Sequence, residues 1–390
     1  MEKVYLLGGL RSHIGLAGGI FRQIPAEDLA AALLEKLALR YPYVREAEGI
    51  LGGNAVGSGG NITRLAALKA GFPEKMPAVT IDMQCASAAE ALALGMAKIG
   101  SGMADLLIAG GFESASMQPL RKYNPADPRF TEAGFKTAQF SPDSNSPRAM
   151  LEGAERTCHK HGFAREELDA FAVRSHALAK KAQESGALAD VTVSLFGSIR
   201  DEGIRTRMSQ TLATRMPTLF AKEQVTALWG QEEAPVLTAA NACLTSDGAA
   251  FAILCSEKYL QENALKPELR LLAACEVGVD PRYCPEGAIE VGEALLRRQN
   301  VAPGQIDIFE YNEAFAVISA LFARNYAALA DRYCPWGGAL AYGHPYGASG
   351  AILLLHLWQG LKQSGGHLGL LSRNLPCRHD AKKRHQLMIK

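Results

Sequence analysis

The stretch that decides the fold of this chain is residues 79–92, which read Val-Thr-Ile-Asp-Met-Gln-Cys-Ala-Ser-Ala-Ala-Glu-Ala-Leu. Residues 79–83 favour a β-strand, and the small and helix-forming residues after Cys85 favour a helix. A thiol at this junction lies at a helix N-terminus, where unpaired N–H groups and the positive end of the helix dipole favour the thiolate. The stretch therefore predicts covalent catalysis by Cys85. The competing interpretation of a lone cysteine is a small buried apolar side chain.

The pattern around this stretch indicates an α/β protein, because short apolar runs alternate with longer helical segments. Strands are expected near residues 4–7, 49–54, 79–83 and 106–109, and helices near residues 26–40, 63–70 and 86–99. The last of these helices carries only two charged residues, Glu90 and Lys98, so we expect it to be buried.

The second half repeats the first in outline. After an irregular insertion and a strand near residues 251–255, strands are expected near 270–274, 306–311 and 368–371, with helices near 287–298, 313–329 and 351–362. The run Gly-His-Pro-Tyr-Gly-Ala-Ser-Gly at 343–350 precedes the second largely apolar helix, as Cys85 precedes the first. Two similar halves related by a pseudo-twofold axis would bring Cys85 and His344 to one site.

Such a pair has a defined chemistry, since an imidazole can take the thiol proton and the thiolate can attack a carbonyl carbon. Asn312 directly follows the strand expected at 306–311, and polar residues at this position often belong to active sites. Its amide could hold a water that donates to a developing oxyanion. It could equally cap the following helix, and the two roles are compatible.

The composition of the chain excludes several other classes of protein. The chain has 390 residues, 48% of them hydrophobic, and a net charge of +1, so nothing indicates a nucleic-acid partner. The eight cysteines are spread singly without Cys-x-x-Cys spacing, which predicts neither a zinc site nor a disulfide framework and fits a reducing compartment. The N-terminus lacks the features of a signal peptide, and no apolar stretch is long enough to span a bilayer. We therefore expect a cytoplasmic protein without membrane association.

Five motifs together resemble a known family, the thiolases, which comprise the acetyl-CoA acetyltransferases and 3-ketoacyl-CoA thiolases. The motifs are Cys-Ala-Ser at 85–87, Gly-Gly-Phe-Glu-Ser at 110–114, Asn-Ala-Cys-Leu-Thr-Ser-Asp-Gly-Ala-Ala at 241–250, Asn-Glu-Ala-Phe at 312–315, and the run at 343–350. They occur in the family's order and the resemblance covers residues 1 to about 371.

The resemblance implies a thiolase-like duplicated five-layer αβαβα fold with an inserted loop domain. Residues 1–113 plus 236–262 would form the N-terminal half, 114–235 the inserted loop domain, and 263–390 the C-terminal half with an atypical tail at 372–390. It also implies a homodimer or homotetramer that acts on acyl-CoA, with coenzyme A thioesters as substrates and no metal or other cofactor.

The activity implied is acyl transfer to Cys85, followed by condensation with a second acyl-CoA or the reverse cleavage of a 3-ketoacyl-CoA such as acetoacetyl-CoA. His344 would activate Cys85 and form the first oxyanion hole with a water held by Asn312. The Cys85 N–H would serve the second hole. Met150 matches a methionine that contacts pantetheine, although a helix-core role is equally compatible with the sequence. The positions that match the lining of the coenzyme A tunnel are Ala239, Cys243, Ala314 and Phe315.

The C-terminal tail departs from the family. Thiolases end with Cys-x-Gly-Gly-Gly, whose cysteine is the acid/base of the carbon–carbon step, whereas an ungapped count from His344 places Asn374 there and Cys377 lies three residues further on. The tail is basic and contains Pro376, so we do not expect it to form the final core strand. Cys377 could stand in, turnover could be impaired, or the tail could reflect an altered reading frame; we favour impaired turnover. The alternatives to a full thiolase are thus a catalytically impaired acyl-CoA-binding homologue and a ketoacyl-synthase-like condensing enzyme.

Overall fold

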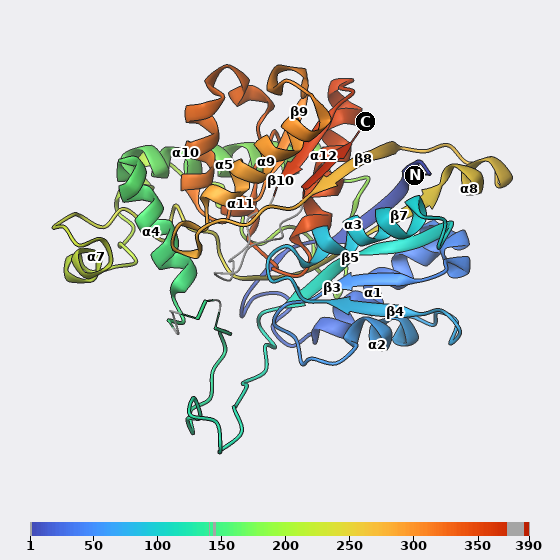
Figure 1. The fold of residues 1–390 in the computed structure, drawn as a ribbon, viewed down its shortest axis with the longest axis horizontal. Coiled ribbons are helices and arrows are strands. Elements are labelled where there is room, and N and C mark those ends of the chain that lie inside the picture. Colours follow the sequence, from blue (N-terminus) through green and yellow to red (C-terminus); the bar gives the residue numbers. More distant parts are fainter. Residues whose placement is uncertain (1, 140, 143–145, 373–385, 390) are drawn as a thin grey trace.

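The computed structural model describes residues 2–139, 141–142, 146–372 and 386–389. Within these residues the chain is an α/β structure built on one 11-stranded sheet (Figure 1). Its strands are β1 (Val4–Ser12), β2 (Gly15–Leu16), β3 (Ile50–Gly53), β4 (Ala78–Ile81), β5 (Leu106–Ser114), β6 (Thr192–Val193), β7 (Ser246–Ser256), β8 (Leu269–Cys275), β9 (Ile308–Tyr311), β10 (Gly369–Ser372) and β11 (Gln386–Ile389).

The helices are α1 (Ala26–Arg40), α2 (Ile62–Lys69), α3 (Ser87–Gly100), α4 (Ala149–His161), α5 (Arg165–Ser185), α6 (Gln210–Thr214), α7 (Lys222–Trp229), α8 (Glu257–Glu262), α9 (Glu286–Gln299), α10 (Ala316–Asn325), α11 (Ala339–Tyr342) and α12 (Ser349–Ser364). They include some that cover both faces of this sheet and others, such as α6 and α7, that pack on those helices.

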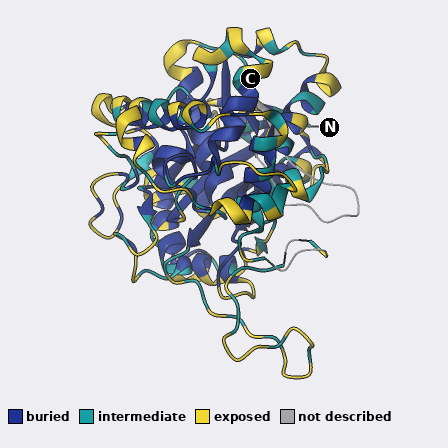
Figure 2. Ribbon diagram, turned by 90° about the vertical axis from the view of Figure 1, so that its left-hand side faces the viewer, coloured by how far each residue is buried: buried dark blue, intermediate teal, exposed yellow. Residues whose placement is uncertain are grey.

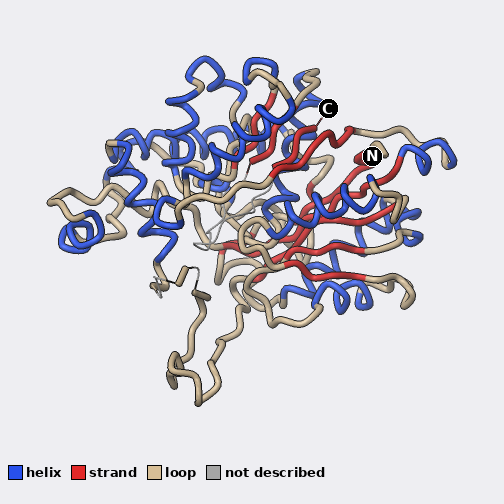
Figure 3. The backbone as a smooth tube through the Cα atoms, viewed as in Figure 1, coloured by secondary structure: helices blue, strands red, loops and turns tan. Residues whose placement is uncertain are grey.

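The sheet consists of two halves joined edge to edge, which Figure 3 shows as a continuous band of strands. The strand order is β4-β3-β5-β7-β1-β8-β11-β10-β9. β3 is parallel to β4 and β5, and β10 is parallel to β9, whereas β7 runs antiparallel to β5 and β1. The halves meet where β1 pairs antiparallel with β8, with Val4 opposite Leu271.

Three apolar cores separate the layers, because neighbouring residues of a strand point to opposite faces of a sheet. On β1, Leu7 packs with α1 and α2, whereas Leu6 packs with α3 and α12. On β9, Ile308 joins the core around α12, whereas Phe309 faces α9 and α10. The order helix, sheet, helix, sheet, helix confirms the predicted five-layer duplicated fold.

The two central helices lie largely in the interior of the molecule. All residues of α12 from Ser349 to Leu361 are buried, and α3 buries most of its small side chains, as expected for helices that are apolar on nearly every face. Figure 2 shows this buried interior with the exposed surface concentrated on the outer helices and loops.

One expectation about the tail was wrong. Residues 386–389 form β11, which pairs antiparallel with both β8 and β10 and so completes the second half-sheet. A strand inserted there satisfies backbone groups on both neighbours, which would otherwise face each other unpaired. Pro376 lies ten positions before this strand and does not interrupt it.

The region between β5 and β7 contains α4 to α7 and long irregular segments. Helices α4 and α5 pack beside α10, on the apolar core that lies between the second half-sheet and helices α9 and α10. The described residues that follow β5 extend away from the body in Figure 1. The predicted division of the chain into three domains stays a prediction. None of the helices in the described ranges is both long enough and apolar enough to cross a lipid bilayer.

Candidate active site

Cys85 lies in a tight turn between β4 and α3. Gln84, just before it, has a φ of +48°, a left-handed conformation that costs energy in a residue with a side chain. The Ser87 hydroxyl fixes the turn, since it accepts from the Met83 N–H at 2.8 Å and donates to the Gln84 carbonyl at 2.6 Å. The turn holds the half-buried Cys85 one residue before Ala86, the N-cap of α3. The predicted junction is confirmed.

The N-termini of α3 and α12 lie in direct contact, and glycines permit it. A Cβ on Gly350 would be 2.4 Å from the Ala89 nitrogen, and one on Gly53 would be 2.5 Å from the Ala88 nitrogen and 2.7 Å from the Gly347 carbonyl oxygen. The segments that precede the two helices therefore lie next to each other, and these segments carry Cys85 and His344.

His344 is held in one tautomer by its neighbours. Its Nδ1 lies 2.7 Å from the Ser349 hydroxyl, which itself donates to the Pro345 carbonyl at 2.8 Å. Because that hydroxyl proton is already engaged, Nδ1 carries the imidazole proton, and Nε2 keeps its lone pair. The ring is only 2% exposed, so its orientation is fixed. The arrangement presents Nε2 as a base.

Asn312 lies at the end of β9 with its amide nitrogen 3.3 Å from His344 Nε2. Its alternative role as a helix cap was wrong, because α10 begins at Ala316 with Phe315 as its N-cap. The residues between form a turn in which the Ala314 N–H donates to the Asn312 carbonyl at 2.7 Å. The Asn312 side chain is thus available to the site, and among the described residues its Oδ1 has no hydrogen-bond partner.

The segment around Cys243 connects the Asn312 turn to the His344 loop. The Cys243 N–H donates to the Ala314 carbonyl at 3.0 Å, and the His344 N–H donates to the Leu244 carbonyl at 2.9 Å. Burial, and next the nearby Cys85 thiol, raises the pKa of Cys243 above its usual range, so this thiol stays protonated at neutral pH. Cys85, His344, Asn312, Cys243 and Ala314 therefore form one constellation.

For the residues predicted to bind coenzyme A, the structure shows their positions but not their roles. Met150, at the start of α4, is half-buried with its sulfur 3.9 Å from the sulfur of Cys284. Ala239 is half-buried and accepts from Arg205 at 3.4 Å, and Phe315 is buried opposite Ala242. Their roles in binding coenzyme A stay predictions, and Cys377 lies outside the described residues.

Sequence reasoning missed Glu113, the penultimate residue of the fully buried β5. Its carboxylate accepts from the Asn54 amide at 2.9 Å, the Ala55 N–H at 3.0 Å and the Gly347 N–H at 3.0 Å. It therefore ties the loop after β3 to the loop that carries His344. Two signals in the sequence pointed to it, namely its place in the motif at 110–114 and its charge near the end of an otherwise apolar strand, but neither indicated its partners.

Glu113 predicts a pH dependence of stability. Burial raises its pKa from 4.5 to about 7, although the N–H groups of Ala55, Val56 and Gly347 oppose the shift. An acid whose pKa is raised by folding stabilises the folded state below its unfolded pKa, and this stabilisation, about 3 kcal/mol, is lost as the pH rises through 7. Urea unfolding at about pH 5 and about pH 7.5 should show a smaller loss for Glu113→Gln than for the unmodified chain. An equal loss in both proteins would contradict this assignment.

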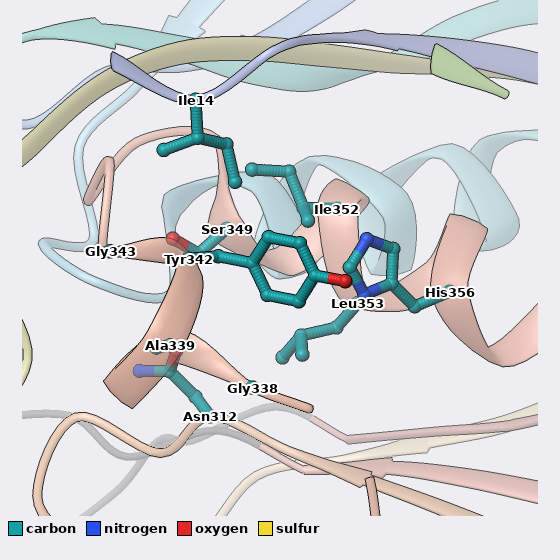
Figure 4. Close-up of a pocket in the computed structure, with 10 residues that line it drawn as sticks. All are labelled: Ile14, Asn312, Gly338, Ala339, Tyr342, Gly343, Ser349, Ile352, Leu353 and His356. Carbon is teal, nitrogen blue, oxygen red and sulfur yellow. The ribbon is translucent and has the colours of Figure 1, made fainter. Parts of the chain in front are cut away.

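A small cavity with a mostly apolar lining and a few polar groups lies beside this constellation (Figure 4). Its volume of about 20 Å³ would accommodate one water molecule. Asn312, Ser349, Tyr342 and His356 supply its polar lining, and neither Cys85 nor His344 is among the residues that line it. The cavity thus lies behind the site rather than forming the substrate channel.

Comparison with known proteins places this geometry in a family. A model of the thiolase N-terminal domain matches residues 4–258, and one of the thiolase C-terminal domain matches residues 265–377. The chain belongs to the thiolase family. This match also favours a thiolase over the ketoacyl-synthase-like alternative.

Thiolase relatives match along nearly their whole length. The "Putative acetyl-CoA C-acetyltransferase YhfS" of Bacillus subtilis is 33% identical over 373 residues, which cover 92% of this chain and 95% of that protein. The similarly named VraB of Staphylococcus aureus MRSA252 is 31% identical over 367 residues, covering 92% and 93%.

Solved thiolase structures are also similar. The Bacillus anthracis acetyl-CoA acetyltransferase has a TM-score of 0.88 at 26% identity, covering 100% of this chain and 98% of that one. The Ascaris suum Acat5 thiolase in complex with coenzyme A has a TM-score of 0.87 at 27% identity, covering both chains fully (100% and 100%). Together with the family match, these similarities identify a thiolase-type acyltransferase.

Proposed function

We propose that this thiolase transfers the acyl group of a coenzyme A thioester to Cys85. The observation that carries the proposal is the fixed tautomer of His344, whose Nε2 lone pair is presented at the shared N-termini of α3 and α12. The Ascaris suum thiolase, crystallised with coenzyme A, supports coenzyme A as the carrier.

In the proposed reaction the proton of Cys85 Sγ passes to His344 Nε2, and the thiolate attacks the acyl carbon. The carbonyl oxygen becomes an oxyanion, which the protonated imidazole and a water held by the Asn312 amide stabilise by hydrogen bonds. The bond to the coenzyme A sulfur then breaks, and that sulfur recovers the proton from His344. The products are an acyl thioester on Cys85 and free coenzyme A.

The cysteine nucleophile is tested by mass. Incubation with acetyl-CoA should add one acetyl group to the intact protein, and peptide mapping should locate it on Cys85. Cys85→Ala should show no such adduct, because no other thiol of the constellation is activated. Cys255→Ala is the matched control, because Cys255 lies opposite Leu106 at the other end of β7, and this variant should still acquire the acetyl group. Equal labelling of the unmodified chain and Cys85→Ala would refute the proposal.

The complete reaction would make or cleave a 3-ketoacyl-CoA, with acetoacetyl-CoA as the proposed substrate. This step needs a second acid/base, for which Cys377 is the candidate. Because the sequence around Cys377 lacks the family's Cys-x-Gly-Gly-Gly, a second candidate function is a homologue that binds acyl-CoA and stops at the acyl-enzyme. Comparing thiolysis of acetoacetyl-CoA with that of longer 3-ketoacyl-CoAs separates the two, because the second candidate cleaves none of them.

Assembly and location remain parts of the same proposal. The resemblance to thiolases supports a homodimer or homotetramer, which light scattering on the purified chain would distinguish from a monomer. A cytoplasmic location and a role in fatty acid metabolism stay predictions.

A further inference from the structure

Tyr346 lies against the proposed catalytic base. It follows His344 by two residues, is half-buried, and packs edge-on to the imidazole with ring centroids 5.0 Å apart and ring planes at 89°. Its hydroxyl lies 3.0 Å from the Thr245 hydroxyl. The phenol is therefore positioned at both ends, by a ring contact on one side and a hydrogen bond on the other.

The same phenol also lies near the proposed nucleophile. Burial chiefly, and then the neighbouring Cys243 and Cys85 thiols, raise the pKa of Tyr346 above its usual range. The hydroxyl therefore stays protonated at neutral pH, so Tyr346 acts here by its volume and as a hydrogen-bonding group rather than as a base.

The backbone that carries this ring has little freedom to move. The Gly347 N–H donates to buried Glu113 at 3.0 Å, and the Ala348 N–H donates to the Pro345 carbonyl at 2.9 Å. A Cβ on Gly347 would be 2.5 Å from the Phe112 carbonyl oxygen, so the loop lies directly on β5. The loop cannot withdraw the phenol from the site without breaking these contacts.

We propose that Tyr346 sets the length of the acyl group that Cys85 accepts. The inference rests on the proposed acyl transfer to Cys85. Because His344 must reach the Cys85 thiol in the proposed transfer, an acyl group on that sulfur lies near the Tyr346 ring, which packs on the imidazole and is hydrogen-bonded to Thr245. A two-carbon group fits beside such a ring, whereas each further methylene must displace it, and overfilling a packed site is costly.

The test measures the rate of Cys85 acylation by acetyl-, butyryl- and hexanoyl-CoA, read by intact mass over time. We expect the unmodified chain to prefer acetyl-CoA to hexanoyl-CoA by at least about tenfold. Tyr346→Leu, which removes the ring, should reduce this preference by about tenfold. Tyr346→Phe, which keeps the ring and removes the hydroxyl, is the matched control and should retain it.

Several results would overturn the inference. The first is that the unmodified chain shows no preference for short acyl groups, and the second is that Tyr346→Leu leaves the preference unchanged. The third is that Tyr346→Phe loses the preference as fully as Tyr346→Leu, because the preference would then depend on the hydroxyl and not on the ring. Tyr346→Met, with a flexible side chain, provides a second test of ring volume if the leucine variant does not fold. Absence of any acylation in the unmodified chain is a different result, because it refutes the acyl transfer itself and the inference with it.

Discussion

Replacing His344 by alanine is expected to slow acylation of Cys85 by acetyl-CoA by about a thousandfold. The thiol would lose the group that accepts its proton, and the oxyanion would lose its charged hydrogen-bond donor. His344 is buried and its Nδ1 is bonded to Ser349, so the ring is held in the orientation from which Nε2 acts. The measurement is the rate of acetyl incorporation, followed by intact mass under single-turnover conditions.

The matched control for this substitution is His367→Ala. His367 is exposed beyond the far end of α12, so roughly the length of that helix, about 24 Å, separates it from His344. Its replacement should leave the acylation rate within twofold. Comparable rates in His344→Ala and the unmodified chain would show that Cys85 does not depend on this base.

The sequence was sufficient to place Cys85 and His344 before the two central helices, because both positions depend on local patterns that the duplication repeats. A strand followed by a helix of small residues is visible within fifteen positions, and the second half supplies its counterpart before α12. Gly350 lets the two helices meet, and Gly53 lets β3 lie against α3 and the His344 loop; both roles become visible only from the close contact of backbones.

The supporting residues could not be predicted in the same way, because their partners are distant in the chain. Glu113 bonds to Asn54, 59 positions before it, and to Gly347, 234 positions after it. Tyr346 and Thr245 are 101 positions apart. No periodicity or spacing encodes such pairs, which become visible only once the sheet and its loops are assembled.

Two local expectations failed for a related reason. Asparagine is a common helix cap, which is why Asn312 was expected to cap the next helix. Instead, the Ala316 N–H donates to the Asn241 carbonyl and the Cys243 N–H donates to the Ala314 carbonyl. These long-range bonds fix the turn before α10 begins. Residues 386–389 follow a basic segment, yet they form a strand because they pair with the edges of β8 and β10. In both cases backbone pairing with a remote segment outweighs local preference.

The largest effect on stability is expected for Gly111→Ala. Gly111 lies on β5, where an added Cβ would be 2.0 Å from the Gly347 carbonyl oxygen and 2.7 Å from that of Gly53. Both neighbours are backbone atoms, so relief requires moving the loop that carries His344. We expect the free energy of unfolding, measured in urea, to fall by about 3 kcal/mol. The displaced loop should also slow acylation of Cys85.

Gly304→Ala provides the control, since a Cβ at Gly304 would have no neighbour within 4 Å. Its free energy of unfolding should stay within about 0.5 kcal/mol of the unmodified value. Both variants lose the same backbone freedom in the unfolded chain when glycine becomes alanine. The difference between their free energies of unfolding therefore measures the steric contact at Gly111. If the two variants were equally stable, the contact between β5 and the His344 loop would not be as close as the structure places it. The rigid positioning of His344 and Tyr346 would then lose its physical basis.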